Sequence, residues 1–185
     1  MSVEIVRFAS IPATPWKNGL GTTRQLAIHP PGADANTFEW RISIAELTGT
    51  APFSAFDGVE RCLAMLEGEV TLLREAQPAI TLTTASPPLT FSGNEPITGR
   101  VTGAALDLNL MYRPSRWQAT MRKIVLNEPA RLSGDVTMLC ALAPLQIDVA
   151  DRRIGLERYD LLRIANAAIF AASAGVAYAI ELRER

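Results

Sequence analysis

The stretch RCLAMLEGEVTLL, residues 61–73, indicates the fold, because two apolar runs are separated there by Glu67, Gly68 and Glu69. Glycine adopts the left-handed backbone of tight turns without strain, so the stretch predicts a strand, a turn and a second strand. No segment of the chain shows a sustained helical stripe. Short alternating segments bounded by Pro, Gly, Asn or Asp recur instead: VEIVRF, TTRQLAI, FEWRISIAEL, AITLTT, ALDLNLMY, QATMRKIVL, VTMLCALAPLQIDVA and VAYAIEL. The sequence therefore predicts an all-β protein.

A weak internal repeat predicts two similar domains. The segments LAMLEGEVTLL (63–73) and LCALAPLQIDV (139–149) each read as strand, turn, strand, and each precedes a third strand at LTFSG or YDLLRI. The first copy is similar to the central hairpin of a cupin. We therefore expect a bicupin, with two stacked cupin-like β-barrels of the jelly-roll or double-stranded β-helix type. Residues 1–117 would form the N-terminal barrel with a ligand pocket, and residues 118–185 a mainly structural C-terminal barrel.

Charge excludes the strongly basic classes of function. The chain has 185 residues, 18 basic and 19 acidic side chains, and a formal net charge of -1. No long run of one sign offers a surface for nucleic acid or anionic lipid, so neither partner is expected. A small neutral or anionic metabolite fits this composition better. Lysine is rare, since Lys17 and Lys123 are the only two.

The sequence favours a cytoplasmic protein. The start, MSVEIVRFAS, alternates and carries an early acid, unlike the apolar core of a targeting peptide. The most apolar stretch, residues 165–180, is shorter than the roughly 20 residues of a spanning helix. Cys62 and Cys140 lie in apolar runs without a CxxC pairing, which is typical of buried free thiols in a reducing compartment.

Strand alternation brings polar side chains to one predicted face. Arg41 and Ser43 share a face of FEWRISIAEL, Asp107 and Asn109 share a face of ALDLNLMY, and Arg61 begins the strand quoted first. If these faces turn toward one lumen, they form a small polar pocket with apolar walls. The alternative is a sheet with one solvated face, on which the same alternation simply points polar residues outward.

The segment WKNGLGTTR, residues 16–24, concentrates hydrogen-bond donors before a strand. Lys17, Asn18, Thr22 and Arg24 are candidates for the mouth of the pocket. The alternative is a glycine turn with capping hydroxyls. The glycine spacing matches neither a phosphate-binding Walker loop nor a dinucleotide fingerprint.

Histidine content argues against the metal chemistry of many cupins. Metal-dependent cupins hold their ion with two or three histidines and a carboxylate, whereas this chain has one histidine, His29. We therefore expect no metal and no cofactor. A Ser-His-Asp triad would depend on the same histidine and lacks a GxSxG elbow.

Long motifs of this chain resemble the HutD/Ves family of bicupin proteins. They occur in the family's order and spacing over residues 15–113: PWKNGLGTTRQLAI, FEWRISIAEL, PFSAFDGVERCLAMLEGE, FSGNEPI and LDLNLMYR. The resemblance implies cupin barrels without the usual metal ligands. It also implies binding of an intermediate of bacterial histidine utilisation, such as urocanate or a formylated glutamate, which tunes the pathway. Leu20 replaces a family glycine, and Leu108 replaces an aromatic residue.

Together these observations predict a non-catalytic metabolite-binding protein. Arginine forks suit carboxylates, so Arg41 and Arg61 are the first candidates for a clamp. The candidate ligand-binding residues are Lys17, Asn18, Thr22, Arg24, Arg41, Ser43, Arg61, Asp107 and Asn109. Trp40 has the opposite parity to Arg41 and is expected in the core.

Two other functions stay open at this stage. One is a metal-independent enzyme that acts on a small carboxylate, with Glu46, Glu67 or Asp107 as the general base. The other is an interaction module whose pocket is vestigial. A homodimer is also compatible with the sequence.

Overall fold

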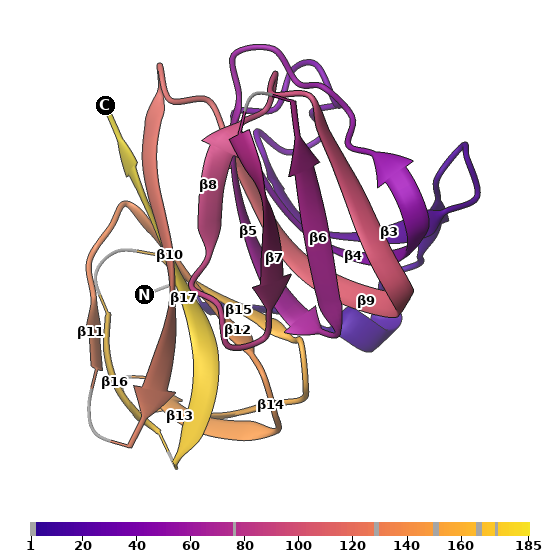
Figure 1. Ribbon diagram of the computed structural model, residues 1–185. Helices are drawn as coiled ribbons and strands as arrows, with labels where there is room; N and C mark the ends of the chain where they lie inside the picture. The colour runs from indigo at the N-terminus through magenta and orange to yellow at the C-terminus, as the bar shows by residue number, and fades with distance from the viewer. Residues whose placement is uncertain (1–2, 76, 128–129, 150–151, 166–167, 173) are drawn as a thin grey trace. The chain divides into compact units, whose positions relative to one another are not determined.

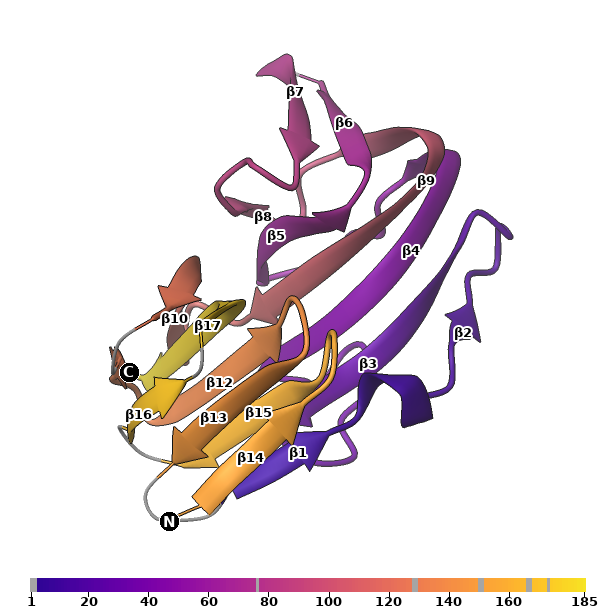
Figure 2. The ribbon, with the colours of Figure 1, turned by 90° about the horizontal axis from the view of Figure 1, so that it is seen from below.

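Strand pairing divides the chain into two all-β units. Residues 12–116 form one, called here the 12–116 unit, and the residues up to Ile11 join residues 117–185 in the other, the terminal unit. The computed structural model describes residues 3–185 except 76, 128–129, 150–151, 166–167 and 173. Strand β1 (Val3–Val6) pairs with β15 (Leu161–Ala165), as Figure 2 shows. The N-terminal strand therefore belongs with the C-terminal ones, which differs from the expected division into 1–117 and 118–185.

The 12–116 unit is a curved antiparallel sheet built on two long strands, β4 and β9 (Figure 1). Its strand order is β2-β3-β4-β9-β5-β8, and β6 pairs with β9 and with β7. The strands are β2 (Thr14–Pro15), β3 (Gly21–His29), β4 (Trp40–Pro52), β5 (Glu60–Glu67), β6 (Glu69–Arg74), β7 (Gln77–Thr83), β8 (Leu89–Ser92) and β9 (Ile97–Tyr112).

Gly68 marks a corner between β5 and β6. Its φ is 66°, and a Cβ at this position would lie 2.8 Å from the Ala104 carbonyl oxygen, so a glycine is required. The two strands do not form the hairpin expected from the sequence. Each strand pairs instead with a different part of β9. The pairing of β6 with β9 begins at Thr71, which lies opposite Arg100. The turn thus redirects the chain along one long strand.

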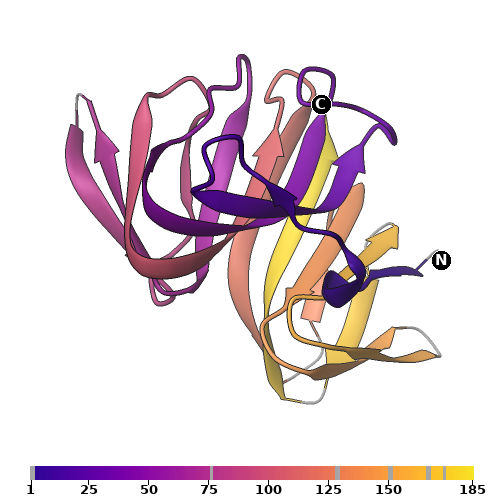
Figure 3. The same cartoon turned by 90° about the vertical axis from the view of Figure 1, so that its right-hand side faces the viewer.

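The terminal unit has two sheets with the orders β1-β15-β12-β17-β10 and β11-β16-β13-β14. Figure 3 shows β17 running beside β10. The further elements are the 3-10 turn η1 (Phe8–Ser10), β10 (Trp117–Leu126), β11 (Ala130–Leu132), β12 (Val136–Ala141), β13 (Leu145–Val149), β14 (Arg152–Leu156), β16 (Ala168–Ala172) and β17 (Gly175–Glu184).

The same pairing scheme occurs in both units. In the 12–116 unit, β5 pairs with β8 and β9, while β6 pairs with β7 and β9. In the terminal unit, β12 pairs with β15 and β17, while β13 pairs with β14 and β16. The strands β16 and β17 thus occupy the places that the single strand β9 has in the first unit.

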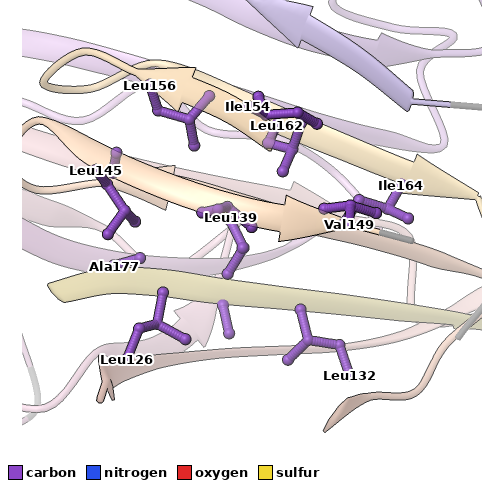
Figure 4. Packing of buried hydrophobic residues seen from close by; sticks show 13 residues of the cluster. Leu126, Leu132, Leu139, Leu145, Val149, Ile154, Leu156, Leu162, Ile164 and Ala177 are labelled. Atoms are coloured by element: carbon purple, nitrogen blue, oxygen red, sulfur yellow. The ribbon is translucent and has the colours of Figure 1, made fainter. Parts of the chain in front are cut away.

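Each unit buries its own apolar core. In the terminal unit, Figure 4 shows Leu139, Leu162 and neighbouring aliphatic side chains gathered between strands. In the 12–116 unit a comparable cluster includes Leu63, Leu72 and Phe91. Burial of each such side chain contributes about 1.5–3 kcal/mol. Trp40 is fully buried, as its parity predicts.

The described residues contain no helix long and apolar enough to cross a membrane. Cys62 and Cys140 are both buried and free of disulfides, as predicted.

Asp160 anchors the N-terminal segment to the terminal unit. Its side chain is 2% exposed. It accepts hydrogen bonds from Arg7 Nη1 at 2.6 Å and from the backbone N–H groups of Phe8 and Glu157 at 2.9 Å each. A buried carboxylate with three donors is strongly held, and its loss leaves those donors without their acceptor.

We expect Asp160→Ala to lower the free energy of unfolding by about 3 kcal/mol, because a buried carboxylate loses two backbone hydrogen bonds and its ion pair with the half-exposed Arg7 together. Urea denaturation measures the change. The matched control is Asp148→Ala, which removes an exposed ion pair with Arg153 and should change stability little. Equal effects of the two substitutions would contradict the anchoring role.

Candidate functional site

A cavity of about 860 Å³ opens in the 12–116 unit, within the range of small-molecule sites. Its lining combines polar and charged side chains with apolar ones. It is lined by Thr14, Pro15, Trp16, Lys17, Asn18, Thr23, Gln25, Arg41, Ser43, Ala45, Leu47, Pro52, Phe53, Ser54, Phe56, Arg61, Asp107, Asn109 and Met111.

The register of three central strands brings the polar residues together. On β4 and β9, Ser43 lies opposite Asn109, and Ala45 lies opposite Asp107. Met111 lies opposite Arg41 on one side and Arg61 on the other. Because directly opposed residues of neighbouring strands project from the same face, these side chains share one face of the sheet.

Seven of the nine candidate residues line this cavity, and two do not. Thr22 and Arg24 are absent from the lining, where Thr23 and Gln25 stand instead. The register of β3 is the cause, because Thr22 lies opposite Glu46 and Arg24 lies opposite Ile44, on the reverse face of the sheet. A bulge between Gln25 and Ala27 shifts the alternation only in the last part of the strand. Ligand binding by the seven others stays a prediction.

The segment from Trp16 to Gly21 is the turn of the β2–β3 hairpin. The Asn18 side-chain oxygen accepts the Leu20 N–H at 3.0 Å, and Gly19 has a φ of 70°. Trp16 donates its indole N–H to Thr23 Oγ1 at 2.8 Å and packs where a Cβ on Gly21 would otherwise lie. The glycine-turn interpretation thus describes the conformation. The same turn places Lys17 and Asn18 on the cavity lining.

Buried polar side chains of this unit concentrate at the cavity. Among its described residues the buried polar or charged ones are Ser43, Arg61, Asp107 and Asn109, with exposures of 2–7%, and all four line the cavity. The terminal unit buries Asp160, whose carboxylate is filled by the three donors described above. The buried carboxylate of the terminal unit therefore has a structural role, whereas the buried polar side chains of the 12–116 unit lie together at the cavity.

Four buried polar atoms at the cavity have no hydrogen-bond partner within the described protein. They are Arg41 Nε, Arg61 Nε, Asp107 Oδ1 and Asn109 Oδ1. A buried group without a partner costs about 1–3 kcal/mol, and native proteins seldom leave one unexplained. Two donors and two acceptors of this kind in one cavity are typical of a site that receives a polar ligand.

Burial sets the electrostatics of the site. It raises the pKa of the Asp107 carboxyl to about 7, although the Arg61 charge and a hydrogen bond from the Ala45 backbone act in the opposite direction. Burial lowers the pKa of Arg61 to about 10, which leaves the guanidinium charged at neutral pH. Burial likewise lowers the pKa of Arg41.

Aromatic rings hold the Arg61 guanidinium in place. Its Cζ lies 4.7 Å from the Phe53 ring centroid and 5.3 Å from that of Phe91. Contacts of this kind replace part of the hydration that a buried arginine loses. Strand alternation does not predict these ring contacts, because Phe53 lies in the segment after β4 and Phe91 lies on β8, which pairs with β5.

The carboxylates proposed for a general base separate in the structure. Glu46 lies opposite Leu106, on the reverse face of the sheet. A bulge between Met65 and Glu67 also turns Glu67 to the Leu106 face. Asp107 alone of the three lines the cavity. The described residues contain no cluster of three His, Cys, Asp or Glu side chains arranged to hold a metal ion.

His29 lies outside the cavity lining. Its ring stacks on Trp40 with centroids 5.4 Å apart, and its Nε2 lies 3.8 Å from a Glu39 carboxylate oxygen. These contacts give the one histidine a packing role at the end of β3.

Comparisons with known proteins agree on one family. The family model described as HutD matches residues 9–180. A 21.2 kDa protein in the hutC 3′ region of Pseudomonas putida is 31% identical over 170 residues, which are 88% of this chain and 86% of that protein. The structure of HutD from Pseudomonas fluorescens SBW25 has a TM-score of 0.85 and 25% identity, and 100% of each chain is covered.

The fold is cupin-like. A cupin 2 conserved barrel domain protein from Leptotrichia buccalis has a TM-score of 0.62 at 9% identity, with 100% of this chain and 98% of that chain covered. An identity this low bears on the fold alone. In this chain the sheets are open at their edges, since the strand orders do not close on themselves.

The raised pKa of Asp107 predicts a pH dependence of stability. Between pH 4 and 7 the folded protein keeps a proton that the unfolded chain releases, so stability falls as pH rises through this window. Asp107→Asn lacks this proton and should gain roughly 2–3 kcal/mol relative to wild type between pH 5 and pH 8.

Urea unfolding at the two pH values measures the difference. Glu46→Gln is the matched control, since it removes an exposed carboxylate on the reverse face of β4 and should follow the wild-type curve. A constant difference between Asp107→Asn and wild type from pH 5 to 8 would rule out the buried protonated carboxyl.

Proposed function

Because the chain belongs to the HutD family, we propose that its 12–116 unit binds a small carboxylate metabolite and thereby modulates histidine utilisation without catalysing a reaction. The matching relative in the hutC 3′ region supports the pathway. A carboxylate intermediate of the urocanate or formylated glutamate type is the proposed ligand.

The observation that carries this proposal is the pair of arginines at one cavity. Arg41 and Arg61 flank Met111 from the two neighbouring strands, and the Nε atom of each is buried without a protein partner. A guanidinium offers two parallel N–H donors that match the two oxygens of a carboxylate. Lys17 adds a third positive charge to the lining. An anionic ligand satisfies the donors and neutralises part of this charge.

The remaining lining supports a ligand with a flat or aliphatic body. Phe53, Phe56 and Met111 supply apolar surface beside the arginines. A carboxylate head on the arginines and an unsaturated or aliphatic chain against these side chains use both kinds of surface.

The family and the fold extend this proposal to the rest of the chain. We propose that the two units are the two halves of a bicupin, because the same strand-pairing scheme recurs in both. A cytoplasmic location fits the free, buried Cys62 and Cys140.

One observation favours a second candidate function. Asp107 lines the cavity with a pKa of about 7, which is the value that suits a general base at neutral pH. In this alternative the protein is a metal-independent enzyme that removes a proton from a carboxylate substrate. Incubation of the protein with each candidate ligand, followed by mass spectrometry, separates turnover from binding.

We expect urocanate or N-formylglutamate to raise the melting temperature of the wild-type protein. A ligand at 100 times its Kd that binds only the folded state adds about 2.7 kcal/mol of stability. Arg41→Ala should weaken binding at least tenfold, because a charge-assisted contact to the carboxylate is lost. Differential scanning fluorimetry and calorimetric titration measure these effects.

Arg100→Ala is the matched control, because Arg100 is exposed on the same sheet and does not line the cavity. It should bind as wild type does. Absence of binding by urocanate, N-formylglutamate, glutamate and histidine in folded protein contradicts the proposed pathway. Equal losses in Arg41→Ala and Arg100→Ala contradict the proposed site.

A further inference from the structure

Arginine clamps explain only half of the unpartnered atoms in the cavity. The other half are two acceptors, Asp107 Oδ1 and Asn109 Oδ1, which carry no hydrogen bond from any described residue. Asp107 and Asn109 are 2% and 6% exposed, so both are more than nine-tenths buried, and both line the cavity. They are two residues apart on β9 and therefore project from the same face, about 7 Å apart along the strand.

A ligand whose only polar group is a carboxylate offers no hydrogen-bond donor to these two acceptors. Its oxygens suit Arg41 and Arg61, but above the Asp107 pKa of about 7 an oxygen placed against this carboxylate brings two acceptors of like charge together. Binding sites that are built around a hydrogen bond discriminate strongly against analogues that lack the partner group. The two acceptors therefore indicate that the ligand has a hydrogen-bond donor in addition to its negative charge.

Resting on the proposed function, we propose that the ligand of this site is a carboxylate that also carries an N–H donor, and that Asp107 together with Asn109 recognises this donor. Amides and azoles are the chemical classes that meet this description. The carboxylate lies on the arginines, and the N–H group donates to the acceptors of β9.

Charge balance supports the same class. Arg41 and Arg61 bring two positive charges to the cavity, and ionised Asp107 brings one negative charge. With Lys17 included, the lining carries two net positive charges, which the one or two carboxylates of the proposed ligands neutralise while their N–H group stays neutral. The Ala45 backbone donates to the Asp107 carboxyl, but Oδ1 accepts no hydrogen bond from the part of the chain that the structure describes, so this oxygen is available to the ligand.

Two matched pairs of probes test the donor directly. Urocanate is compared with 3-(2-furyl)acrylate, in which a furan replaces the imidazole and no N–H is present. N-formylglutamate is compared with glutarate, which lacks the amide. Calorimetric titration at pH 8, above the Asp107 pKa of about 7, gives the Kd for each probe. We expect the better N–H probe to bind at least tenfold more tightly than its analogue.

The variants assign the preference to β9. Asp107→Asn keeps the side-chain shape and should reduce the preference to below threefold, as should the second variant, Asn109→Ala. Glu46→Gln, on the reverse face of the sheet, should keep the wild-type preference. Circular dichroism verifies the fold of each variant before titration.

The outcomes separate this inference from the function on which it rests. Equal binding of both members of each pair to wild-type protein overturns the donor inference and leaves carboxylate binding intact. A tenfold preference that survives in both Asp107→Asn and Asn109→Ala also overturns it. Absence of binding by all four probes overturns the proposed function and this inference together.

Discussion

The pairing of β9 with both β4 and β5 is the constraint on which the site depends. A strand with partners on both sides has a fixed register, and a slip by one residue would turn every side chain to the other face. In the observed register Asp107, Asn109 and Met111 project beside Arg41, Ser43 and Arg61. Because these residues come from positions 41 to 111, the site exists only once the sheet has formed.

Buried polar side chains have opposite effects on stability in the two units. In the terminal unit the Asp160 carboxylate accepts hydrogen bonds from Arg7, Phe8 and Glu157, so the buried carboxylate stabilises the fold. In the 12–116 unit Asp107 and Arg61 are buried with open hydrogen-bonding atoms. Burial then costs stability, as the raised pKa of Asp107 indicates. Such a cost is typical of a functional site, where stability is exchanged for affinity.

The fold class and the shared strand faces follow from uninterrupted alternation of side chains, so the sequence predicts them. Features that depend on bulges or on pairing between distant segments are not visible in the sequence. The all-β class and the shared face of Arg41 and Ser43 follow from a two-residue period that side chains reveal directly. Thr22 and Arg24 were predicted as members of a donor-rich segment, whose pattern does not show which of its residues the register of β3 turns toward the cavity. A bulge in β5 likewise turns Glu67 to the reverse face of the sheet. The pairing of β1 with β15 joins segments some 160 residues apart, which local pattern cannot show.

The charges of the cavity lining explain why Asp107 is present beside Arg41 and Arg61. Arg41 and Arg61 repel each other, and the Arg41 charge contributes to the lowered pKa of Arg61. Asp107 opposes this effect without an ion pair to either arginine among the described contacts, so the guanidinium donors stay open. The rings of Phe53 and Phe91 meanwhile fix the direction of Arg61. A site arranged in this way is preorganised, because its charged groups need little reordering when a ligand arrives.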